Sequence, residues 1–215
     1  MSDGVFVTLE GVEGSGKSIQ LNRICELLEE KSIPFAATRE PGGTDLGRQL
    51  RRILLQTDGA ARLPMAEVLL YLADRVQHLN EFILPTLREG KLVLCDRYHD
   101  ATLAYQGFAR GIGVEKIDAL AALLNIRAPD LTLVLDLDVE EGLRRARQRN
   151  LEQETTSMGR FEAESIEFHR KVRQGYLLLA SREPRRIVVV DASAPPQVVF
   201  QSILSTLRQY EVLSR

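Results

Sequence analysis

The fold is decided by eight residues near the start of the chain, Gly11-Val12-Glu13-Gly14-Ser15-Gly16-Lys17-Ser18. They follow an apolar, β-branched run, Val5–Leu9, which predicts a buried strand. After them, apolar side chains recur at helical spacing over Ser18–Lys31, which predicts a helix. The glycines permit a tight turn in which successive N–H groups face one phosphate group, and the helix N-terminus adds positive charge. The stretch therefore predicts a phosphate loop spanning residues 11–18.

Two side chains of this loop carry specific chemistry. Lys17 is placed to reach the outer phosphates of a nucleoside triphosphate, and the Ser18 hydroxyl is placed to bind Mg²⁺. The alternative is a glycine-rich turn that only joins a strand to a helix. The strand–loop–helix context favours a site for ATP or a related nucleotide.

Composition restricts the classes of protein that need to be considered. The 215 residues carry a formal charge of −2, with 44% hydrophobic and 27% charged residues, values that predict one folded domain over residues 1–215. The charge gives no reason to expect a nucleic-acid or membrane partner, and no stretch approaches the roughly 20 apolar residues of a membrane span. A strand beginning at Val5 leaves no room for a signal peptide, so we expect a cytoplasmic protein.

Cysteine and histidine usage predicts neither disulfides nor a metal centre of these residues. Cys25 and Cys95 fall in a predicted helix and a predicted strand, and we expect both to be buried, reduced thiols. The histidines are scattered without metal-ligand spacing, which favours ordinary polar or core roles for His78, His99 and His169.

Strand-like and helix-like patterns alternate along the whole chain. Further apolar runs predict strands at Phe35–Thr38, Leu92–Cys95, Leu131–Leu137 and Ile187–Val190. Helical periodicity predicts helices at Thr44–Leu55, Met65–Leu84, Val114–Asn125, Val139–Arg149, Arg160–Ser181 and Pro195–Tyr210. This alternation predicts an α/β fold with a five-stranded parallel sheet covered by helices on both faces. Ligands of such sheets bind at the carboxyl ends of the strands.

Polar residues after two strands are therefore candidates for the site. Asp96 ends the run Leu92–Cys95 and is placed to bind the Mg²⁺ held by Ser18, directly or through water; the alternative is an exposed strand-end carboxylate. Arg97 follows and would direct a guanidinium at the same phosphates. Arg39 follows the second strand, where it either binds the phosphate of an acceptor or lies solvated beside a Pro-Gly turn.

Arginines cluster between Val139 and Arg160. A polar stretch without apolar periodicity, residues 153–159, separates Arg160 from the other arginines of the cluster. Charge runs of this kind often mark a solvated helix face. Phosphoryl transfer, however, needs cations that close over the moving group, and the phosphate loop supplies only Lys17. We therefore expect a mobile lid at about residues 149–160, with catalytic cations supplied by Arg149 or Arg160.

Two further candidates lie four residues apart on a predicted helix. Tyr71 and Arg75 share one face, where an aromatic ring and an arginine could stack on and hydrogen-bond a base. A core tyrosine and a surface arginine would give the same spacing.

Four segments together resemble the bacterial thymidylate kinases, a family of P-loop nucleoside-monophosphate kinases. They are Glu10–Ser18, Thr38–Thr44, Asp96–Tyr98 and Ala104–Gly107, and their order and spacing match over nearly the whole chain. The resemblance implies a three-layer P-loop NTP-hydrolase-like fold and transfer of a phosphoryl group from ATP to dTMP with Mg²⁺, for dTTP synthesis. It also implies a cytoplasmic homodimer.

The resemblance implies roles for individual residues around the acceptor. Arg39 and Arg97 match arginines that hold the dTMP phosphate and align the two nucleotides. Glu13 matches a carboxylate near the dTMP sugar, and Tyr105 matches a side chain that crowds the deoxyribose 2′ position.

It also implies contacts to the two bases. Tyr71 stands where the family usually has a Phe stacked on thymine, Arg75 matches a residue that bonds the thymine carbonyl, and Gln106 is another base-proximal position. The segment Asp191-Ala192-Ser193 resembles the loop beside adenine. Ala101 departs from the Ser of many relatives, which removes one possible hydrogen bond near the base.

Three alternatives to a dTMP kinase remain open from the sequence. The nearest is a kinase of another nucleoside or nucleoside monophosphate. A P-loop GTPase switch belongs to another class, but the Asn-Lys-x-Asp pattern that reads guanine is absent from the sequence. A catalytically silent scaffold is disfavoured because Lys17, Asp96 and Arg97 are all present.

Overall fold

One parallel sheet organises the computed structural model, which describes residues 4–56, 62–152 and 160–213. Its strands lie in the order β2-β3-β1-β4-β5. Their bounds are β1 Phe6–Glu10, β2 Phe35–Arg39, β3 Leu92–Asp96, β4 Leu131–Asp136 and β5 Ile187–Asp191. All four neighbouring pairs are parallel, with Thr8 of β1 opposite both Cys95 of β3 and Thr132 of β4. The predicted α/β fold with five parallel strands is confirmed.

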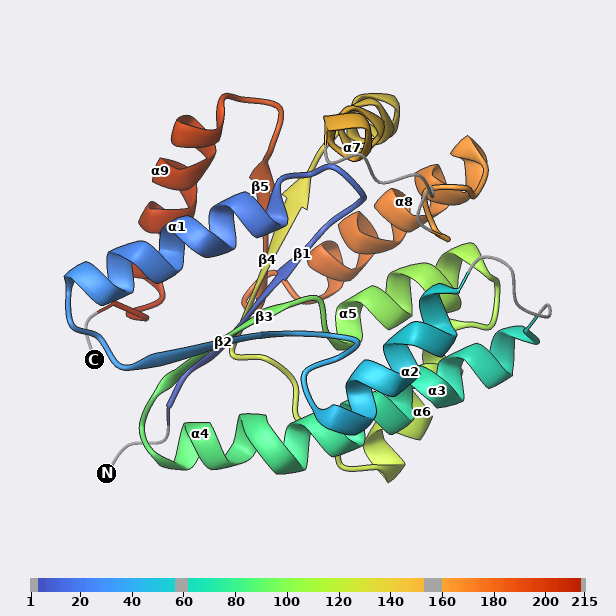
Figure 1. Cartoon of the computed structure of the whole chain (residues 1–215), viewed down its shortest axis with the longest axis horizontal. Helices are drawn as coiled ribbons and strands as arrows, with labels where there is room; N and C mark the ends of the chain where they lie inside the picture. Colours follow the sequence, from blue (N-terminus) through green and yellow to red (C-terminus); the bar gives the residue numbers. More distant parts are fainter. Residues whose placement is uncertain (1–3, 57–61, 153–159, 214–215) are drawn as a thin grey trace.

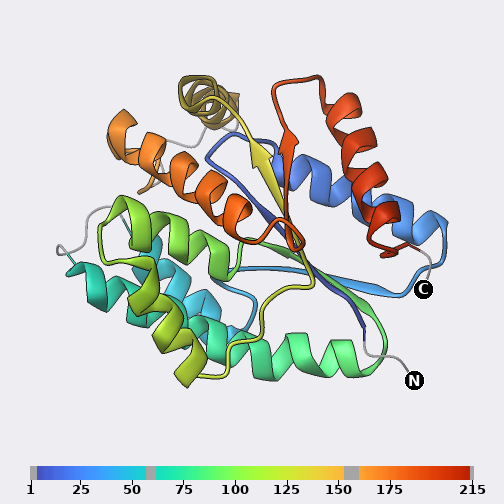
Figure 2. The same cartoon turned by 180° about the vertical axis from the view of Figure 1, so that it is seen from behind.

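Helices cover both faces of this sheet. Figure 1 shows α1 (Lys17–Glu30) and α9 (Pro196–Gln209) on one face, and Figure 2 shows the same layer from behind. Helices on the other face include α4 (Leu84–Arg88), α5 (His99–Thr102) and α8 (Ile166–Arg182). The remaining helices are α2 Asp45–Leu55, α3 Pro64–His78, α6 Val114–Leu123, α7 Val139–Glu152 and two π-helical segments, η1 Leu79–Ile83 and η2 Leu103–Ala109.

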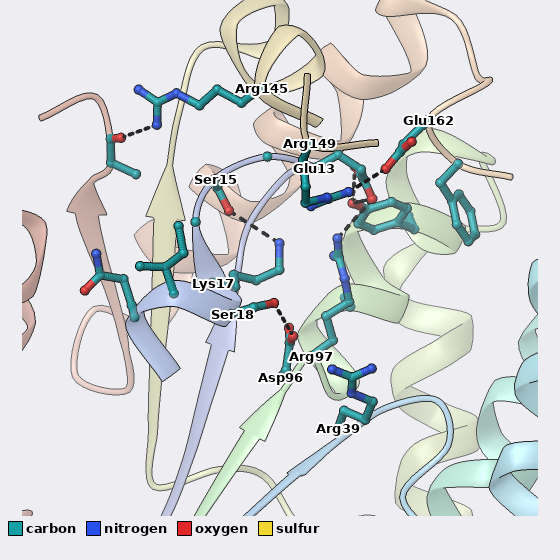
Figure 3. A pocket seen from close by; sticks show the side chains of 18 of the residues that line it. Glu13, Ser15, Lys17, Ser18, Arg39, Asp96, Arg97, Arg145, Arg149 and Glu162 are labelled. Carbon is teal, nitrogen blue, oxygen red and sulfur yellow. Dashed lines mark hydrogen bonds and ion pairs between the residues drawn. The ribbon is translucent and has the colours of Figure 1, made fainter. Parts of the chain in front are cut away.

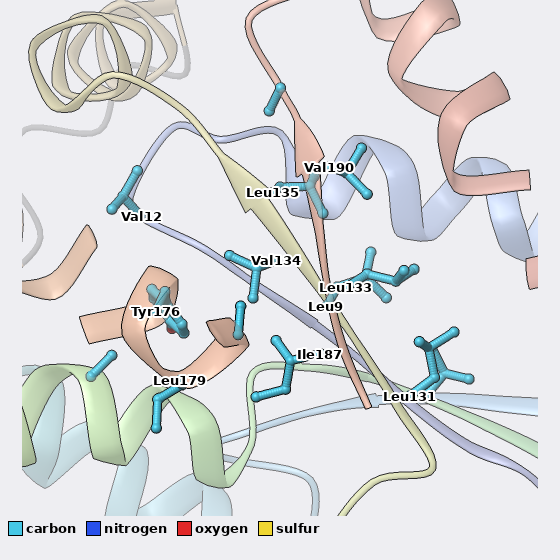
Figure 4. Packing of buried hydrophobic residues seen from close by; sticks show 14 of the residues in the cluster. Leu9, Val12, Leu131, Leu133, Val134, Leu135, Tyr176, Leu179, Ile187 and Val190 are labelled. Carbon is cyan, nitrogen blue, oxygen red and sulfur yellow. The ribbon is translucent and has the colours of Figure 1, made fainter. Parts of the chain in front are cut away.

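The apolar core forms on both sides of the sheet because successive side chains of a strand point to opposite faces. Leu133 and Val190 face the side of α1 and α9, whereas Val134 and Ile187 face α8 (Figure 4). The central strands β1, β3 and β4 are almost wholly buried, while β2 and β5 are the edges and partly exposed. Near-continuous apolar sequence is therefore explained by burial on both faces.

The predicted helix Met65–Leu84 is present, but it is not one continuous α-helix. The structure has α3, then η1, then α4, and the Leu84 N–H donates to the Leu79 carbonyl five residues earlier. Pro85 has no N–H and cannot continue the i→i−4 hydrogen bonds of an α-helix. The π-helical segment lies directly before this break, so the change of hydrogen-bond pattern leaves no N–H unpaired at Pro85.

The predicted helix Arg160–Ser181 begins later than expected. Ser165 caps α8 by accepting a hydrogen bond from the Phe168 N–H at 3.1 Å, which fixes the helix start at Ile166. The segment after β3, expected only as polar sequence, forms α5 and η2. Cys95 is buried as predicted, but Cys25 is only half-buried.

A buried polar network ties α5 to the sheet. Asp100 accepts two hydrogen bonds from Arg186, at 2.8 and 2.9 Å, and a third from the Thr132 hydroxyl. Thr132 in turn lies 2.9 Å from the Thr8 hydroxyl on β1. Burial raises the pKa of Asp100, but the bonds from Arg186 and Thr132 outweigh it and lower that pKa. Helix α5 and the residues that precede it are thereby anchored beneath β1 and β4. Within the described ranges, no helix has the length and apolar character needed to cross a membrane.

Candidate active site

Ionisable residues end every strand of the described sheet. These residues are Glu10, Arg39, Asp96, Asp136 and Asp191. A cleft of about 1260 Å³ opens at this edge and runs from the phosphate loop to α3 on one side and to α7 and the residues after β5 on the other. Figure 3 shows Arg39 and Arg97 directed into it from the ends of β2 and β3, Lys17 from the start of α1, and Arg149 from α7. The concentration of charge follows from the parallel arrangement, which brings the carboxyl ends of all strands together.

The phosphate loop has the conformation that its glycines permit. Gly14 and Gly16 have φ angles of 70° and 90°. A Cβ on Gly14 would lie 2.0 Å from the Gly142 carbonyl oxygen, and a Cβ on Gly142 would lie 2.4 Å from the Glu13 carbonyl oxygen. The loop and α7 therefore touch backbone to backbone through two glycines, which side chains at these positions would prevent.

Lys17 is held over the loop that precedes it. Its Nζ donates to the carbonyl oxygens of Gly11 and Val12, at 3.0 and 2.9 Å, and to Ser15 Oγ at 3.3 Å. Burial, and then the positive charge of Arg97, lower the pKa of Lys17 to about 8 against the opposing effects of Asp96, Glu13 and Glu10. The ammonium group is thus fixed where a phosphate group would bind the loop.

Ser18 and Asp96 form an oxygen pair beside Lys17. The Ser18 hydroxyl lies 3.5 Å from Asp96 Oδ2, and both residues line the cleft. Hydroxyl and carboxylate oxygens suit Mg²⁺, which takes one or two protein ligands and completes its shell with phosphate oxygens and water. Among the described residues there is no cluster of three or more His, Cys, Asp or Glu side chains suited to a metal ion.

Arg97 and Tyr105 meet the carboxylate of Glu13. Arg97 Nη2 donates to Glu13 Oε1 at 3.0 Å, and the Tyr105 hydroxyl lies 2.8 Å from both Glu13 oxygens. The Arg97 guanidinium also lies over the Tyr105 ring, 5.0 Å from its centroid. His169 of α8 approaches the other side, with Nδ1 3.4 Å from Glu13 Oε2.

These contacts set the ionisation of Glu13. Burial alone would raise its pKa, but Arg97, His169, Lys17 and Tyr105 together lower the pKa of Glu13 to about 2. The carboxylate is therefore ionised at neutral pH and orients Arg97 and Tyr105 at the wall of the cleft.

Tyr71 and Arg75 line the part of the cleft bounded by α3. Tyr71 is buried, and burial raises its pKa above the usual range, so its hydroxyl stays protonated. Arg75 is also buried, contrary to the possibility of a surface arginine. Its guanidinium donates to Glu40 Oε2, the Tyr98 carbonyl and the Thr102 hydroxyl, at 2.8, 2.9 and 3.1 Å. Arg75 therefore has a fixed orientation, and most of its five N–H groups are already bonded within the protein.

Glu67, one turn before Tyr71 on α3, organises this region. Its Oε1 accepts from Gln106 Nε2 at 2.7 Å, and its Oε2 pairs with Arg160. Arg160 also donates to the Leu54 carbonyl at 2.8 Å. The guanidinium of Arg160 is thus bound at the α2–α3 side of the cleft.

The other predicted lid arginine also has a carboxylate partner. Arg149 Nη2 donates to Glu162 Oε1 at 3.0 Å, and Glu162 Oε2 accepts from Asn150 at 2.6 Å. Both Arg149 and Arg160 line the cleft. The polar stretch 153–159 of the expected lid lies outside the described residues.

Most predicted site residues share this one cleft, but three do not line it. Gly11 and Val12 are buried at the start of the loop, where their carbonyls accept from Lys17. Asp191 is exposed, and its carboxylate accepts from the Ser193 N–H. Ala192 does line the cleft, and its carbonyl accepts from Arg145 at 3.2 Å.

Several residues contact the predicted site residues although no sequence pattern predicted that they belong to the site. They are Glu40, Glu67, Phe161, Glu162, His169 and Tyr176. Glu67 carried a usable signal, because 67, 71 and 75 lie on one helix face by spacing alone. Glu40, His169 and Tyr176 contact residues far away in the sequence, namely Arg75, Glu13 and Glu10.

A phosphate loop at the carboxyl edge of a parallel sheet, in a cleft that is also lined by arginines, defines a protein of the P-loop class. Comparison with known proteins agrees with this class. The family model for thymidylate kinase matches residues 9–203. The thymidylate kinase of Nitratidesulfovibrio vulgaris is 50% identical over 206 residues, covering 95% of this chain and 96% of that protein. The thymidylate kinase of Syntrophotalea carbinolica is 53% identical over 203 residues, covering 94% of each chain.

A solved structure agrees as well. The crystal structure of thymidylate kinase from Ehrlichia chaffeensis superposes with a TM-score of 0.75 at 29% identity, covering 96% of this chain and 99% of that one. The chain belongs to the thymidylate kinase family.

The low pKa of Glu13 predicts acid-dependent stability. Its folded-state pKa, about 2, lies below the ordinary value of 4.5, so the ionised carboxylate stabilises the fold above pH 4.5 and this contribution is lost as pH falls toward 2. The whole contribution is about 3 kcal/mol. We expect Glu13→Gln to lower the free energy of unfolding, and the difference from wild type to shrink by about 2 kcal/mol between pH 6 and pH 3.

Urea unfolding at several pH values measures this difference. Glu29→Gln, on the exposed side of α1, is the matched control and should give no comparable change with pH. A Glu13→Gln difference that stays constant from pH 6 to pH 3 would contradict the assignment of the low pKa to Glu13.

Proposed function

We propose that this protein transfers the γ-phosphoryl group of ATP to dTMP, giving ADP and dTDP. The observation that carries the proposal is the joint position of Lys17 and the Arg97–Glu13–Tyr105 cluster at one edge of a single cleft. The thymidylate kinase family match over residues 9–203 supports dTMP as the acceptor.

The acceptor pocket is proposed to lie between α3 and η2. The Tyr71 ring stacks on thymine, and Gln106 and Arg75 face the edge of the base from positions fixed by Glu67 and Glu40. Arg39 binds the acceptor phosphate from the end of β2, where its side chain is exposed in the cleft.

The donor nucleotide is proposed to lie along the phosphate loop, with its adenine near Ala192. Phosphoryl transfer needs positioning and charge stabilisation rather than a covalent intermediate. Lys17 and Arg97 neutralise the charge on the transferring group, and the partly buried Glu13 keeps Arg97 directed toward it. Ser18 and Asp96 are the residues that would hold Mg²⁺, which supplies positive charge to the phosphate oxygens.

The first test is ADP release with Mg-ATP and a panel of acceptors, namely dTMP, dUMP, UMP, CMP, AMP, GMP and thymidine. We expect dTMP to be turned over selectively, because Tyr71 keeps an aromatic face for stacking although it replaces the usual Phe. Preference for another monophosphate would leave the phosphate machinery in place and refute the thymine pocket.

Lys17→Ala is the negative control for this assay. Loss of a charge directed at the transferring phosphoryl group should lower kcat at least about a hundredfold. Lys31→Ala, an exposed lysine at the end of the same helix, should leave kcat unchanged. No turnover with any acceptor, together with tight and selective guanine-nucleotide binding, would favour a GTPase-like switch instead.

The arginines that flank residues 153–159 are proposed to supply further catalytic charge. Arg149 and Arg160 both line the cleft, and each is paired with a carboxylate. Either arginine could exchange this carboxylate partner for phosphate oxygens. We expect Arg149→Ala or Arg160→Ala to slow single-turnover transfer at least about tenfold, by loss of a charge-assisted contact. Arg185→Ala, an exposed arginine outside the cleft, is the control. Wild-type single-turnover rates in both alanine variants would contradict a catalytic role for these arginines.

A homodimer formed through α2 and α3 is also proposed. These helices pack together and expose apolar side chains at helical spacing, Leu46 and Ile53 on α2 and Met65 and Leu69 on α3. Leu69→Glu should shift the mass measured by light scattering from dimer to monomer. Val198→Glu, an equally exposed apolar position on α9, should not. A wild-type monomer at micromolar concentration would refute the dimer.

We propose a cytoplasmic location on the basis of the two free thiols, Cys25 and Cys95, which suit a reducing compartment. Cell fractionation tests it, and recovery of the protein outside the cytoplasmic fraction would refute it.

A further inference from the structure

Two buried groups beside the cleft have no part in the mechanism so far. Glu10 is the last residue of β1 and is fully buried, directly before the phosphate loop. Tyr176 is buried on α8, which belongs to a different layer. The Tyr176 hydroxyl donates to Glu10 Oε2 at 2.8 Å, and the Tyr98 N–H donates to Glu10 Oε1 at 2.7 Å. Both oxygens of the carboxylate are therefore engaged as acceptors.

The same hydroxyl holds Arg97. Arg97 Nη1 donates to the Tyr176 hydroxyl oxygen at 3.3 Å, while Nη2 donates to Glu13. A tyrosine hydroxyl has one hydrogen to donate and lone pairs to accept with. Because Glu10 takes that hydrogen, the lone pairs of the oxygen face Arg97. Burial raises the pKa of Tyr176 well above its ordinary value, so the hydroxyl keeps its hydrogen.

The backbone of Arg97 also depends on Glu10. Arg97 has a φ angle of 69°, in the left-handed region that residues other than glycine rarely adopt. The next N–H, that of Tyr98, is the one that Glu10 Oε1 accepts. Glu10 thus fixes the peptide that follows Arg97 as well as the hydroxyl that its guanidinium contacts.

We infer that Glu10 and Tyr176 are positioning residues for Arg97, with the buried carboxylate orienting the tyrosine hydroxyl and the hydroxyl fixing the guanidinium toward the transferring phosphoryl group. The inference rests on the proposed function only for the role of Arg97. It makes α8 a second support for Arg97, opposite the support from Glu13 in the phosphate loop.

The charges around Glu10 give this arrangement a pH dependence. Asp100 on α5, Arg97 and Tyr98 after β3, Lys17 on α1 and Tyr176 on α8 face it. Burial, and then the negative charge of Asp100, raise the pKa of Glu10 to about 7 against the opposing effects of Arg97, Tyr176 and Tyr98.

Ionisation of Glu10 near neutral pH changes how the Tyr176 hydroxyl is oriented. A protonated carboxyl oxygen cannot accept the Tyr176 hydrogen as the carboxylate does, so the orientation of the hydroxyl is lost below the pKa of Glu10. Turnover of the wild type should therefore rise as pH increases through about 7.

Tyr176→Phe, Glu10→Gln and the double variant test the inference. Tyr176→Phe keeps the ring and removes only the hydroxyl, and it should lower the single-turnover rate about tenfold by loss of a hydrogen bond to a charged group. The KM for ATP should stay within twofold of wild type, because the phosphate loop is untouched. Tyr210→Phe at the end of α9, outside the cleft, removes a hydroxyl in the same way and should have no effect.

The double variant distinguishes a shared route from two separate effects. If Glu10 acts on Arg97 through Tyr176, Glu10→Gln should add little to Tyr176→Phe, whereas independent effects would multiply. Glu10→Gln alone should also lack the rise in rate near pH 7 relative to wild type, a comparison in which titration of the nucleotide phosphates cancels. Wild-type rates in both single variants, multiplicative losses in the double variant, or an unchanged pH profile in Glu10→Gln would each overturn the inference.

These outcomes are separable from failure of the proposed function. Wild-type protein is first assayed with the acceptor panel, and the variants are then compared with whichever acceptor it uses. A different acceptor would refute the thymine pocket and leave the test of Glu10 and Tyr176 intact.

Discussion

Desolvation of charge at the carboxyl edge of the sheet is the constraint on which the rest of the structure depends. A parallel sheet brings the ends of all its strands together, and here each described strand ends on an ionisable residue. A charge taken out of water must be paired or hydrogen-bonded. Asp136 is held by two bonds from Arg173 at 2.7 and 2.9 Å, and Glu10 by Tyr176 and the Tyr98 N–H. Helix α8 supplies Arg173 and Tyr176, so its position is set by the charges at the strand ends as well as by its apolar face.

Two carboxylates three residues apart show how closely the environment sets ionisation. Burial opposes the charged form of both Glu10 and Glu13. Glu13 has Arg97, His169 and Lys17 beside it, and its pKa falls to about 2. Glu10 has the like charge of Asp100 nearby, and its pKa rises to about 7. Such divergence between neighbouring groups is common at functional sites, where each group is required in a particular protonation state.

Local sequence predicted the sheet and the phosphate loop because both are encoded by contiguous residues. Apolar runs predicted all five strands, and the spacing of the glycines predicted the position of the loop between β1 and α1. Helix regularity was less predictable. The π-helical slip before Pro85 and the late start of α8 at its Ser165 cap depend on single hydrogen bonds that periodicity does not register.

The supporting contacts of the site were not predictable in the same way. Arg75 was identified as a candidate, but its burial depends on Glu40, 35 residues earlier, and Tyr176 contacts Glu10 across 166 residues. These pairs follow no spacing rule, because they arise from how helices pack on the sheet. Sequence motifs therefore identified residues that line the cleft and missed those that hold them in place.

Helices α7 and α8, which precede and follow residues 153–165, are both anchored on the phosphate loop or the strand before it. Helix α7 touches the loop through the backbone contact of Gly142 with Gly14, where any side chain would collide. Helix α8 reaches Glu13 through His169 and Glu10 through Tyr176. Displacement of either helix would therefore disturb the carboxylates that orient Arg97, or the loop that carries Lys17. Because Arg145 and Arg149 lie on α7, which is anchored in this way, the phosphate loop also sets the position of the positive charge beside it.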